Sequence, residues 1–336
     1  MSGISEEARE RTRIAVYGAG AWGAALAMVA ARAGHEVALV GRDHAVADAI
    51  NRTRRTPYLP GMDLPEGIQA TADPASLLHA EIILLATPAQ VTGIAAGEIS
   101  RHARPGTAVV SCAKGIDRQT GLLVSEVAFA SYAKGPIAVL SGPGFAADVA
   151  LGLPTAVTIA AEDLILAEAL CQILAGPGFR PYAASDMVGV QLGGALKNVL
   201  AIAAGVVAGR RLGASAEAAV ITRGFVEMRR LAAAWGAKSD TLMGLSGLGD
   251  LVLTCRSTQS RNFALGVALG EGADPATFGK LAEGAFTASI AVERAVAFGI
   301  EAPIMHCVAA VLDGSLSVDG AVERLLSRPL KREDVY

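Results

Sequence analysis

The sequence predicts an α/β fold, with a doubly wound, mainly parallel sheet followed by an all-helical domain. At 336 residues the chain exceeds what one hydrophobic core usually holds, which favours two domains. Aliphatic residues dominate its 52% hydrophobic content and aromatic residues contribute only 4%, a composition that suits helices packed closely on a sheet. In the first half, short apolar runs alternate with helix-compatible segments, as in parallel strands joined by crossover helices.

The first predicted strand is Arg13–Tyr17, and an Ala-rich helical stretch runs from Gly18 to about Gly34. Further apolar runs predict strands at Glu36–Val40, Ile82–Ala86, Ala108–Ser111, Ile137–Ser141 and Ala156–Ala160.

After about Ser185 the pattern changes to long apolar stretches with helical spacing. These stretches are Asp186–Ala208, Ala216–Trp235, Phe263–Leu269 and Ala288–Phe298. We therefore predict a dinucleotide-binding domain at residues 1–185 and a helical substrate domain at residues 186–336.

Charge and hydropathy exclude several classes of partner. The 29 basic and 32 acidic residues are interspersed, which argues against nucleic-acid binding. The richest apolar segments, such as Leu192–Val207, are interrupted by Gly, Lys197 and Asn198, so no membrane insertion is expected. The polar N-terminus, Met1–Arg11, lacks the apolar core of a secretory signal, and we expect a cytoplasmic protein.

Cysteines and histidines give no sign of a metal site. The four cysteines lie far apart, form no C-x-x-C pair and are expected to be small buried hydrophobic residues: Cys112, Cys171, Cys255 and Cys307. The five histidines show no ligand spacing.

Residues 18–23, Gly-Ala-Gly-Ala-Trp-Gly, fit the G-x-G-x-x-G pattern between the first strand and the first helix. In a Rossmann-type site Gly18 permits the tight turn, Gly20 lets a pyrophosphate approach the helix N-terminus, and Gly23 allows close packing of helix on strand. The alternative is a purely structural turn.

The end of the second strand bears on cofactor choice. Arg42 suits the 2′-phosphate of NADP, which we favour, whereas Asp43 would bond a ribose hydroxyl of NAD if the turn shifted by one residue. Arg42 as an ordinary solvated arginine is the alternative.

Two charged residues in apolar surroundings are candidates for catalysis. Burial of Lys197 would lower its pKa and make it a proton donor to a carbonyl oxygen. Asp250, set among glycines and leucines, is a plausible partner for a buried ammonium. A snorkelling surface lysine and a helix-capping aspartate are the alternatives.

Two further motifs indicate an anionic substrate. Ser260, Arg261 and Asn262 precede an apolar helix, so polar side chains and free helical N–H groups converge there. Lys114 follows a predicted strand at the carboxyl edge, where open α/β sheets bind ligands. A simple serine cap and an exposed loop lysine are the alternatives.

Eight motifs follow one another along the chain: residues 18–27, residues 86–90 (Ala-Thr-Pro-Ala-Gln), residues 114–116, residues 141–146, residues 196–199, residues 247–251, residues 260–262 and residues 282–284. Taken in this order, over nearly the whole chain, they resemble bacterial NAD(P)-dependent glycerol-3-phosphate dehydrogenase. The resemblance implies reversible reduction of dihydroxyacetone phosphate to sn-glycerol 3-phosphate, feeding glycerophospholipid synthesis, by a cytoplasmic enzyme that is often a homodimer.

The resemblance also implies residue roles, with Lys197 as the catalytic acid and base and Asp250 orienting it. The implied substrate-binding residues are Lys114, Gly142, Gly144, Asn198, Thr254, Ser260, Arg261 and Asn262. The implied cofactor-binding residues are Gly18, Gly20, Ala21, Trp22, Gly23, Arg42, Tyr58, Lys114, Ala146, Arg261, Leu281 and Glu283.

The sequence departs from the family at Gly144, where the family usually has Ser or Thr, so we expect one hydroxyl contact to be lost. Two rival functions stay open: another β-hydroxyacid-type dehydrogenase, and a regulator that binds NADP(H) without turnover. The anion-binding motif at Ser260 argues against the first, and the second gives no reason for Lys197 and Asp250 in apolar surroundings.

Overall fold

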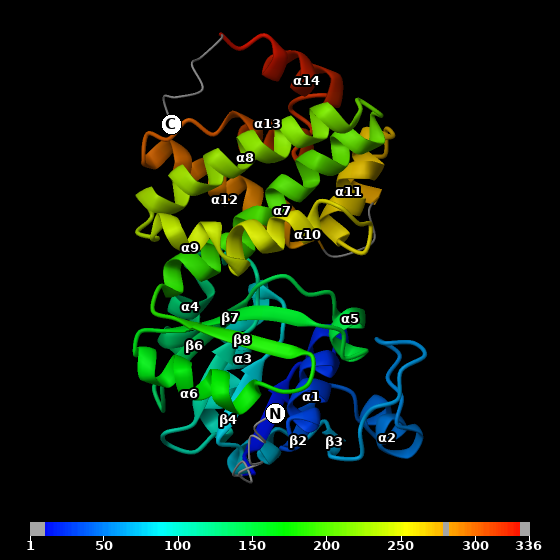
Figure 1. Cartoon of the computed structure of the whole chain (residues 1–336), viewed down its shortest axis with the longest axis vertical. Coiled ribbons are helices and arrows are strands. Elements are labelled where there is room, and N and C mark those ends of the chain that lie inside the picture. The colour runs from blue at the N-terminus through cyan, green and yellow to red at the C-terminus, as the bar shows by residue number, and fades with distance from the viewer. Residues whose placement is uncertain (1–10, 278–281, 330–336) are drawn as a thin grey trace, which may run out of the picture.

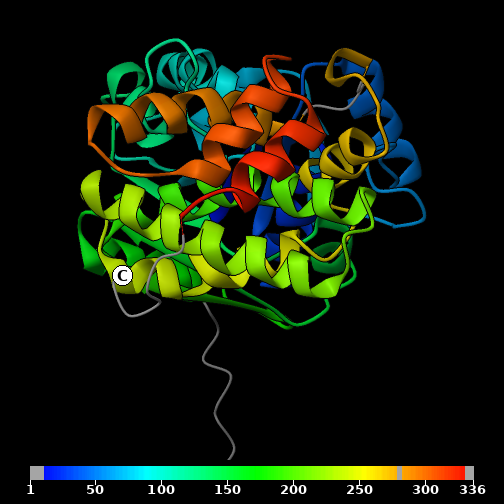
Figure 2. The ribbon, with the colours of Figure 1, turned by 90° about the horizontal axis from the view of Figure 1, so that it is seen from above.

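The computed structural model describes residues 11–277 and 282–329. A sheet with its covering helices forms one half, and a helical part is stacked on it (Figure 1). Figure 2 looks down onto the helical part, whose helices lie over the sheet half.

Eight strands form one sheet in the order β3-β2-β1-β4-β5-β6-β7-β8. The strands are β1 (Arg13–Tyr17), β2 (Glu36–Val40), β3 (Ile68–Thr71), β4 (Ile82–Leu85), β5 (Ala108–Ser111), β6 (Ile137–Ser141), β7 (Thr155–Ala161) and β8 (Phe179–Ala184). Neighbours from β3 to β6 are parallel, β7 runs antiparallel to β6, and β8 is parallel to β7. The prediction of a doubly wound, mainly parallel sheet is confirmed.

The strand order places a switch point between β1 and β4. From β1 the chain builds outward to β2 and β3, then crosses back to add β4 on the other side of β1. Ligands of such sheets bind outside the carboxyl ends of the strands at this point. The helices of this half are α1 (Ala21–Arg32), α2 (His44–Thr53), α3 (Thr92–His102), α4 (Val124–Ser131), α5 (Ala146–Ala150) and α6 (Leu164–Leu174).

Two strands, β3 and β8, were not predicted from the sequence, and both are edge strands of the sheet. In β8, Phe179 is buried whereas Arg180 and Tyr182 are exposed, and Pro181 lies between them. An edge strand is covered less completely than a central one, so it lacks the continuous apolar run by which the central strands were found.

Every element after Asp186 in the described residues is helical. The longer helices are α7 (Met187–Gly209), α8 (Ala214–Ala234), α11 (Arg261–Gly270), α12 (Glu283–Ala297), α13 (Pro303–Leu312) and α14 (Val318–Leu326); α9 (Ser239–Met243) and α10 (Asp250–Thr254) are short. The boundary expected after residue 185 falls in the connection between β8 and α7. The division into two domains stays a prediction.

Helix α7 is the central element of the helical part. It is long and apolar enough to cross a membrane, but 78% of its most apolar window is buried inside the protein. Its apolar surface is therefore used to pack the other helices. The four cysteines are free and buried, as expected.

Helices α7 and α11 meet backbone to backbone through paired glycines. A Cβ on Gly205 would lie 2.2 Å from the carbonyl oxygen of Phe263, and one on Gly266 would lie 2.1 Å from that of Ile202. Gly209 and Gly270 repeat the arrangement one turn further along. This contact sets the distance between the site residues that the two helices carry.

Candidate active site

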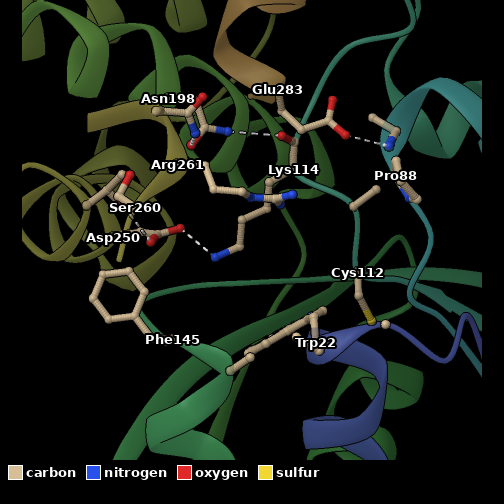
Figure 3. Close-up of a pocket in the computed structure, with 18 of the residues that line it drawn as sticks. Trp22, Pro88, Cys112, Lys114, Phe145, Asn198, Asp250, Ser260, Arg261 and Glu283 are labelled. Atoms are coloured by element: carbon tan, nitrogen blue, oxygen red, sulfur yellow. Dashed lines mark hydrogen bonds and ion pairs between the residues drawn. The ribbon is translucent and has the colours of Figure 1, made fainter. Parts of the chain in front are cut away.

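A cavity of about 530 Å³ lies between the sheet half and the helical part, and both halves line it. The sheet half contributes Gly20, Trp22, Thr87, Lys114 and Phe145, among others. The helical part contributes Lys197, Asn198, Asp250, Thr254, Ser260, Arg261, Asn262 and Glu283. Figure 3 shows Lys114, Arg261 and Asp250 facing this space from different elements.

The glycine loop has the geometry that its sequence predicts. Gly18 has a φ of +117°, and a Cβ there would lie 2.7 Å from the carbonyl oxygen of Ala86, at the end of β4. A Cβ on Gly23 would lie 1.8 Å from the carbonyl oxygen of Gly18, so only glycine allows α1 to begin so close to β1. Around Gly20 no atom lies within 4 Å of an added Cβ, which leaves space for a pyrophosphate at the N-terminus of α1.

A second cavity, of about 860 Å³, continues from the glycine loop along the ends of β1 and β2. Arg42 and Tyr58 line it, and it shares Gly20 and Thr87 with the first cavity. Asp43 caps α2, because its carboxylate accepts hydrogen bonds from the N–H groups of Ala45 (2.8 Å) and Val46 (3.2 Å). Both hydrogen bonds go to Oδ1 of Asp43, whereas Arg42 is exposed at the cavity.

Three buried polar atoms on the cavity wall fit a polar ligand such as a dinucleotide. The indole Nε1 of Trp22, Oγ1 of Thr87 and Oε2 of Glu283 have no hydrogen-bond partner among the described residues. Buried polar atoms are rarely left unpaired in folded proteins, so each marks a place where a ligand or ordered water belongs.

Lys197 lies on α7 and is only 6% exposed. Its Nζ donates to Oδ1 of Asp250 (2.8 Å) and to Oγ1 of Thr254 (2.6 Å). Burial lowers its pKa to about 8; Asp250 opposes this shift and Lys114 adds to it. The structure thus excludes a snorkelling surface lysine and provides an ammonium that can give up its proton near neutral pH.

Asp250 is the first residue of α10, and its carboxylate pairs with the ammonium groups of two lysines. Its Oδ2 accepts a hydrogen bond of 2.7 Å from Nζ of Lys114, while its Oδ1 binds Lys197. Burial alone would raise its pKa, but the two ammonium groups outweigh burial and the pKa is lowered. One carboxylate against two cations leaves an excess positive charge at the cavity.

Lys114 joins this cluster from the other half of the protein. Besides Asp250, its Nζ contacts the carbonyl oxygen of Gly142 (2.7 Å), and its ammonium lies 5.9 Å from the centre of the Trp22 ring. Gly142 has a φ of +140° and its Cβ would lie 2.9 Å from Cα of Val157, so glycine is required there.

The three residues before and within the first turn of α11 differ in what they contact. Ser260 caps the helix, its Oγ accepting from the N–H of Phe263 (3.2 Å). Asn262 donates to Oδ1 of Asn198 (2.9 Å) and accepts from the N–H of Gly284 (2.9 Å). The guanidinium of Arg261 lines the cavity and has no hydrogen-bond partner within the described part of the chain.

Asn198 links this group to Lys114, since its Nδ2 donates to the carbonyl oxygen of Lys114 (3.1 Å). The dashed line from Asn198 in Figure 3 marks this contact between the two halves. Asn198 and Asn262 therefore hold the backbone around the cavity, and Arg261 is the side chain left available to an anion.

Most of the expected site residues meet at these two cavities. Gly144 and Ala146 line the first together with Ala21, while Leu281 lies outside the described residues. The Lys114–Asp250 ion pair was not predicted from the sequence, nor were several lining residues, among them Thr87, Phe145, Leu253 and Gln259. Thr87 was detectable, because it directly follows a predicted strand at the carboxyl edge. Among the described residues no group of His, Cys, Asp and Glu could hold a metal ion.

Comparisons with known proteins agree over most of the chain. The family model for the N-terminus of NAD-dependent glycerol-3-phosphate dehydrogenase matches residues 13–167, and the model for its C-terminus matches residues 186–323. A glycerol-3-phosphate dehydrogenase (NAD(P)+) from Bradyrhizobium sp. strain BTAi1 is 54% identical over 321 residues, which cover 96% of this chain and 98% of that protein. One from Azorhizobium caulinodans is 55% identical over 322 residues, with the same coverage. A crystal structure of glycerol-3-phosphate dehydrogenase from Coxiella burnetii has a TM-score of 0.88 and 38% identity, covering 95% of this chain and 99% of that one.

Proposed function

Because this chain belongs to the NAD-dependent glycerol-3-phosphate dehydrogenase family, we propose that it reversibly reduces dihydroxyacetone phosphate to sn-glycerol 3-phosphate with NAD(P)H. One observation carries the proposal: a buried ammonium, Lys197, lies on the wall of a cavity that also contains the glycine loop and Arg261. A proton donor, a dinucleotide site and an anion site are the three parts that this reaction needs.

Gly20 and Trp22 would hold the dinucleotide, whose nicotinamide would supply a hydride to the carbonyl carbon C2 of the substrate. Lys197 gives the proton that the carbonyl oxygen then takes up, and in the reverse direction its neutral amine removes that proton. Asp250 and Thr254 fix the position of Nζ through hydrogen bonds of 2.8 and 2.6 Å. General acid catalysis of this kind is worth about 10²- to 10⁴-fold.

The substrate phosphate is assigned to Arg261 and the N-terminus of α11. The guanidinium offers paired donors to phosphate oxygens, and the helix adds favourable N–H dipoles. Lys114 extends the positive charge toward the reacting carbonyl. The family membership and this phosphate site favour a glycerol-3-phosphate dehydrogenase over other β-hydroxyacid-type dehydrogenases.

For the cofactor we propose a preference for NADP over NAD. In support of this, the exposed Arg42 lines the second cavity and its guanidinium suits a 2′-phosphate, while Oδ1 of Asp43 caps α2. Tyr58, exposed on the same cavity, offers a ring on which an adenine can stack.

In the cell we propose a cytoplasmic homodimer that supplies glycerophospholipid synthesis. The resemblance to the bacterial family supports this assignment. Size-exclusion chromatography with light scattering tests the dimer, whose mass would be twice the 34.2 kDa of one chain.

The test of the function is to follow oxidation of NADPH and of NADH separately with dihydroxyacetone phosphate, with unphosphorylated dihydroxyacetone as control. We expect turnover with the phosphorylated ketone only, and a higher kcat/KM with NADPH. Binding of NADPH without any turnover would support the non-catalytic regulator instead.

The assignment of Lys197 is tested by Lys197→Met, which keeps most of the aliphatic stem but removes the amine. We expect NADPH binding to persist and kcat to fall by about 10²-fold or more. Lys238→Met, at an exposed lysine on the helical part, is the matched control. Full turnover by the Lys197 variant would refute its role.

A further inference from the structure

Gln90 belongs to the Ala86–Gln90 motif but does not line either cavity. It lies in the short 3₁₀ turn Ala89–Val91 that follows β4, half-buried beneath the loop that carries Lys114. Because Gln90 does not line either cavity, we looked for a role other than ligand contact in the hydrogen bonds of its side chain.

The Gln90 side chain binds the Lys114 loop at two backbone positions. Its Nε2 donates to the carbonyl oxygen of Ile116 (2.8 Å), and its Oε1 accepts from the N–H of Arg118 (3.0 Å). The amide is thus used as both donor and acceptor, and no side chain without both functions can reproduce this pair of contacts.

The N-terminus of α12 meets the same turn. Oε1 of Glu283 accepts from the N–H of Ala89 (3.2 Å), the contact drawn beside Pro88 in Figure 3. Gln90 lies close enough to this carboxylate to favour its ionised form. One turn therefore joins β4, the Lys114 loop and the helical part.

The junction is packed tightly around Gly115, the neighbour of Lys114. A Cβ there would lie 2.7 Å from Cβ of Ala89 and 3.1 Å from Oε2 of Glu283. The loop therefore cannot shift toward the turn, and the Gln90 hydrogen bonds keep it from moving away. Lys114 extends from this clamped segment to Asp250, 2.7 Å from its Nζ.

We propose that Gln90 is a positioning residue that holds the Lys114 loop so that the Lys114 ammonium reaches Asp250 across the cleft. The inference rests on the proposed function, because Lys114 matters through the cluster that surrounds the substrate. Gln90 itself touches neither substrate nor cofactor.

The experiment compares Gln90→Leu with Gln172→Leu, an exposed glutamine on α6, in the dihydroxyacetone phosphate assay. We expect Gln90→Leu to lower kcat/KM by about 10- to 100-fold, because small displacements of a catalytic group cost that much. The alkaline limb of its reduction profile should also move to higher pH, since the Lys114 charge that lowers the pKa of Lys197 has withdrawn. A merely structural role would leave this limb in place.

A double-mutant cycle with Lys114→Met identifies the route of the effect. If Gln90 acts through Lys114, adding Gln90→Leu to the Lys114 variant costs little more activity. Full additivity of the two losses overturns the proposal, as does wild-type activity or an unshifted pH limb in Gln90→Leu.

Gly115→Ala perturbs the same junction from the Lys114 loop, and we expect it to lower kcat/KM and to shift the alkaline limb as Gln90→Leu does. This second variant keeps the test decisive if Gln90→Leu does not fold. Activity and a pH limb like those of the wild type in Gly115→Ala would count against the proposal. Measurements on the wild type distinguish the two hypotheses. Absence of turnover by the wild type would refute the proposed function, whereas normal turnover by the wild type and by the variants would refute only the role of Gln90.

Discussion

Lys197 is a cation in a long, largely buried apolar helix, and neighbouring polar groups offset the cost of burying its charge. An unpaired buried ammonium is strongly unfavourable, and removing one partner of a buried ion pair typically costs about 3–5 kcal/mol. Asp250 and Thr254 satisfy the amine, and Lys114 keeps the carboxylate shared between two cations. Burial lowers the pKa of Lys197 to about 8, with Lys114 adding to this shift and Asp250 opposing it.

Because Lys197 has a pKa near neutral pH, we expect pH to change kcat/KM in opposite senses for reduction and for oxidation. Reduction needs the protonated amine, so its kcat/KM should fall as pH rises through about 8; oxidation needs the neutral amine, so its kcat/KM should rise over the same interval. Rate profiles between about pH 6 and about pH 10 in both directions check this. Limbs that move in the same direction would contradict the acid and base role.

Gly144 provides a second test at the scale of one residue. An added Cβ would lie 3.4 Å from the Trp22 ring and from Val149, in ordinary contact, so the position has room for a small side chain. Gly144→Ser should restore the hydroxyl contact of the family and lower KM for dihydroxyacetone phosphate by about 2- to 10-fold, the worth of one hydrogen bond. Gly144→Ala is the matched control. An unchanged KM in the serine variant would remove the case for that contact.

At the scale of elements, the crossing of α7 and α11 determines the site geometry. Lys197 and Asn198 come from α7, and Arg261 and Asn262 from α11. Because glycines let the two backbones touch, the donor to the carbonyl and the group assigned to the phosphate are held at one separation. A wider crossing would stretch the Asn262–Asn198 bond of 2.9 Å.

Gly266→Ala should therefore weaken both stability and substrate binding. Its Cβ would meet the carbonyl oxygen of Ile202 at 2.1 Å, a backbone atom that cannot move aside cheaply. We expect the free energy of unfolding in urea to fall by about 1–3 kcal/mol, and KM for dihydroxyacetone phosphate to rise. Gly97→Ala, in α3 with nothing within 4 Å, is the control and should be neutral or slightly stabilising. Equal effects of the two substitutions would show that the crossing is not tight.

Over the whole molecule, the charge lining the cleft is opposite in sign to the net charge of the chain. The chain carries a formal charge of −3, yet the first cavity is lined by three cations, Lys114, Lys197 and Arg261, against Asp250 and Glu283. Burial also raises the pKa of Glu283 above its usual value. The cleft should therefore attract phosphorylated ligands to a protein that is acidic overall.

The prediction from this contrast concerns ionic strength. Raising NaCl from about 20 mM to about 200 mM should increase KM for dihydroxyacetone phosphate several-fold, because salt screens the attraction between the cleft and the phosphate. The value of kcat at saturation should change much less, since the buried Lys197–Asp250 pair is little screened. Potassium glutamate in place of NaCl separates screening from chloride binding. A KM that is independent of salt would argue against this field.

The sequence alone predicted the central strands and the glycine loop, and its family resemblance supplied many of the candidate site residues. Apolar runs report burial on both faces of a strand, and the glycine spacing reflects steric limits that act within a few residues. The edge strands β3 and β8 escaped because their alternating burial leaves no such run. Lys197 and Asp250 stood out because charge among aliphatic residues demands a partner.

The partner of each charged side chain in the site depends on the tertiary fold. Lys114 and Asp250 are 136 residues apart, and their contact depends on how the helical part sits on the sheet, which no local pattern records. The roles of Asn198, Asn262 and Gln90 in holding backbone are hidden for the same reason, since a side-chain amide in a sequence does not show what it will bond. Steric limits and hydropathy act between residues that are near in sequence, so they can be predicted from it. Distances across the cleft depend on how the sheet half and the helical part pack together, which involves residues far apart in sequence.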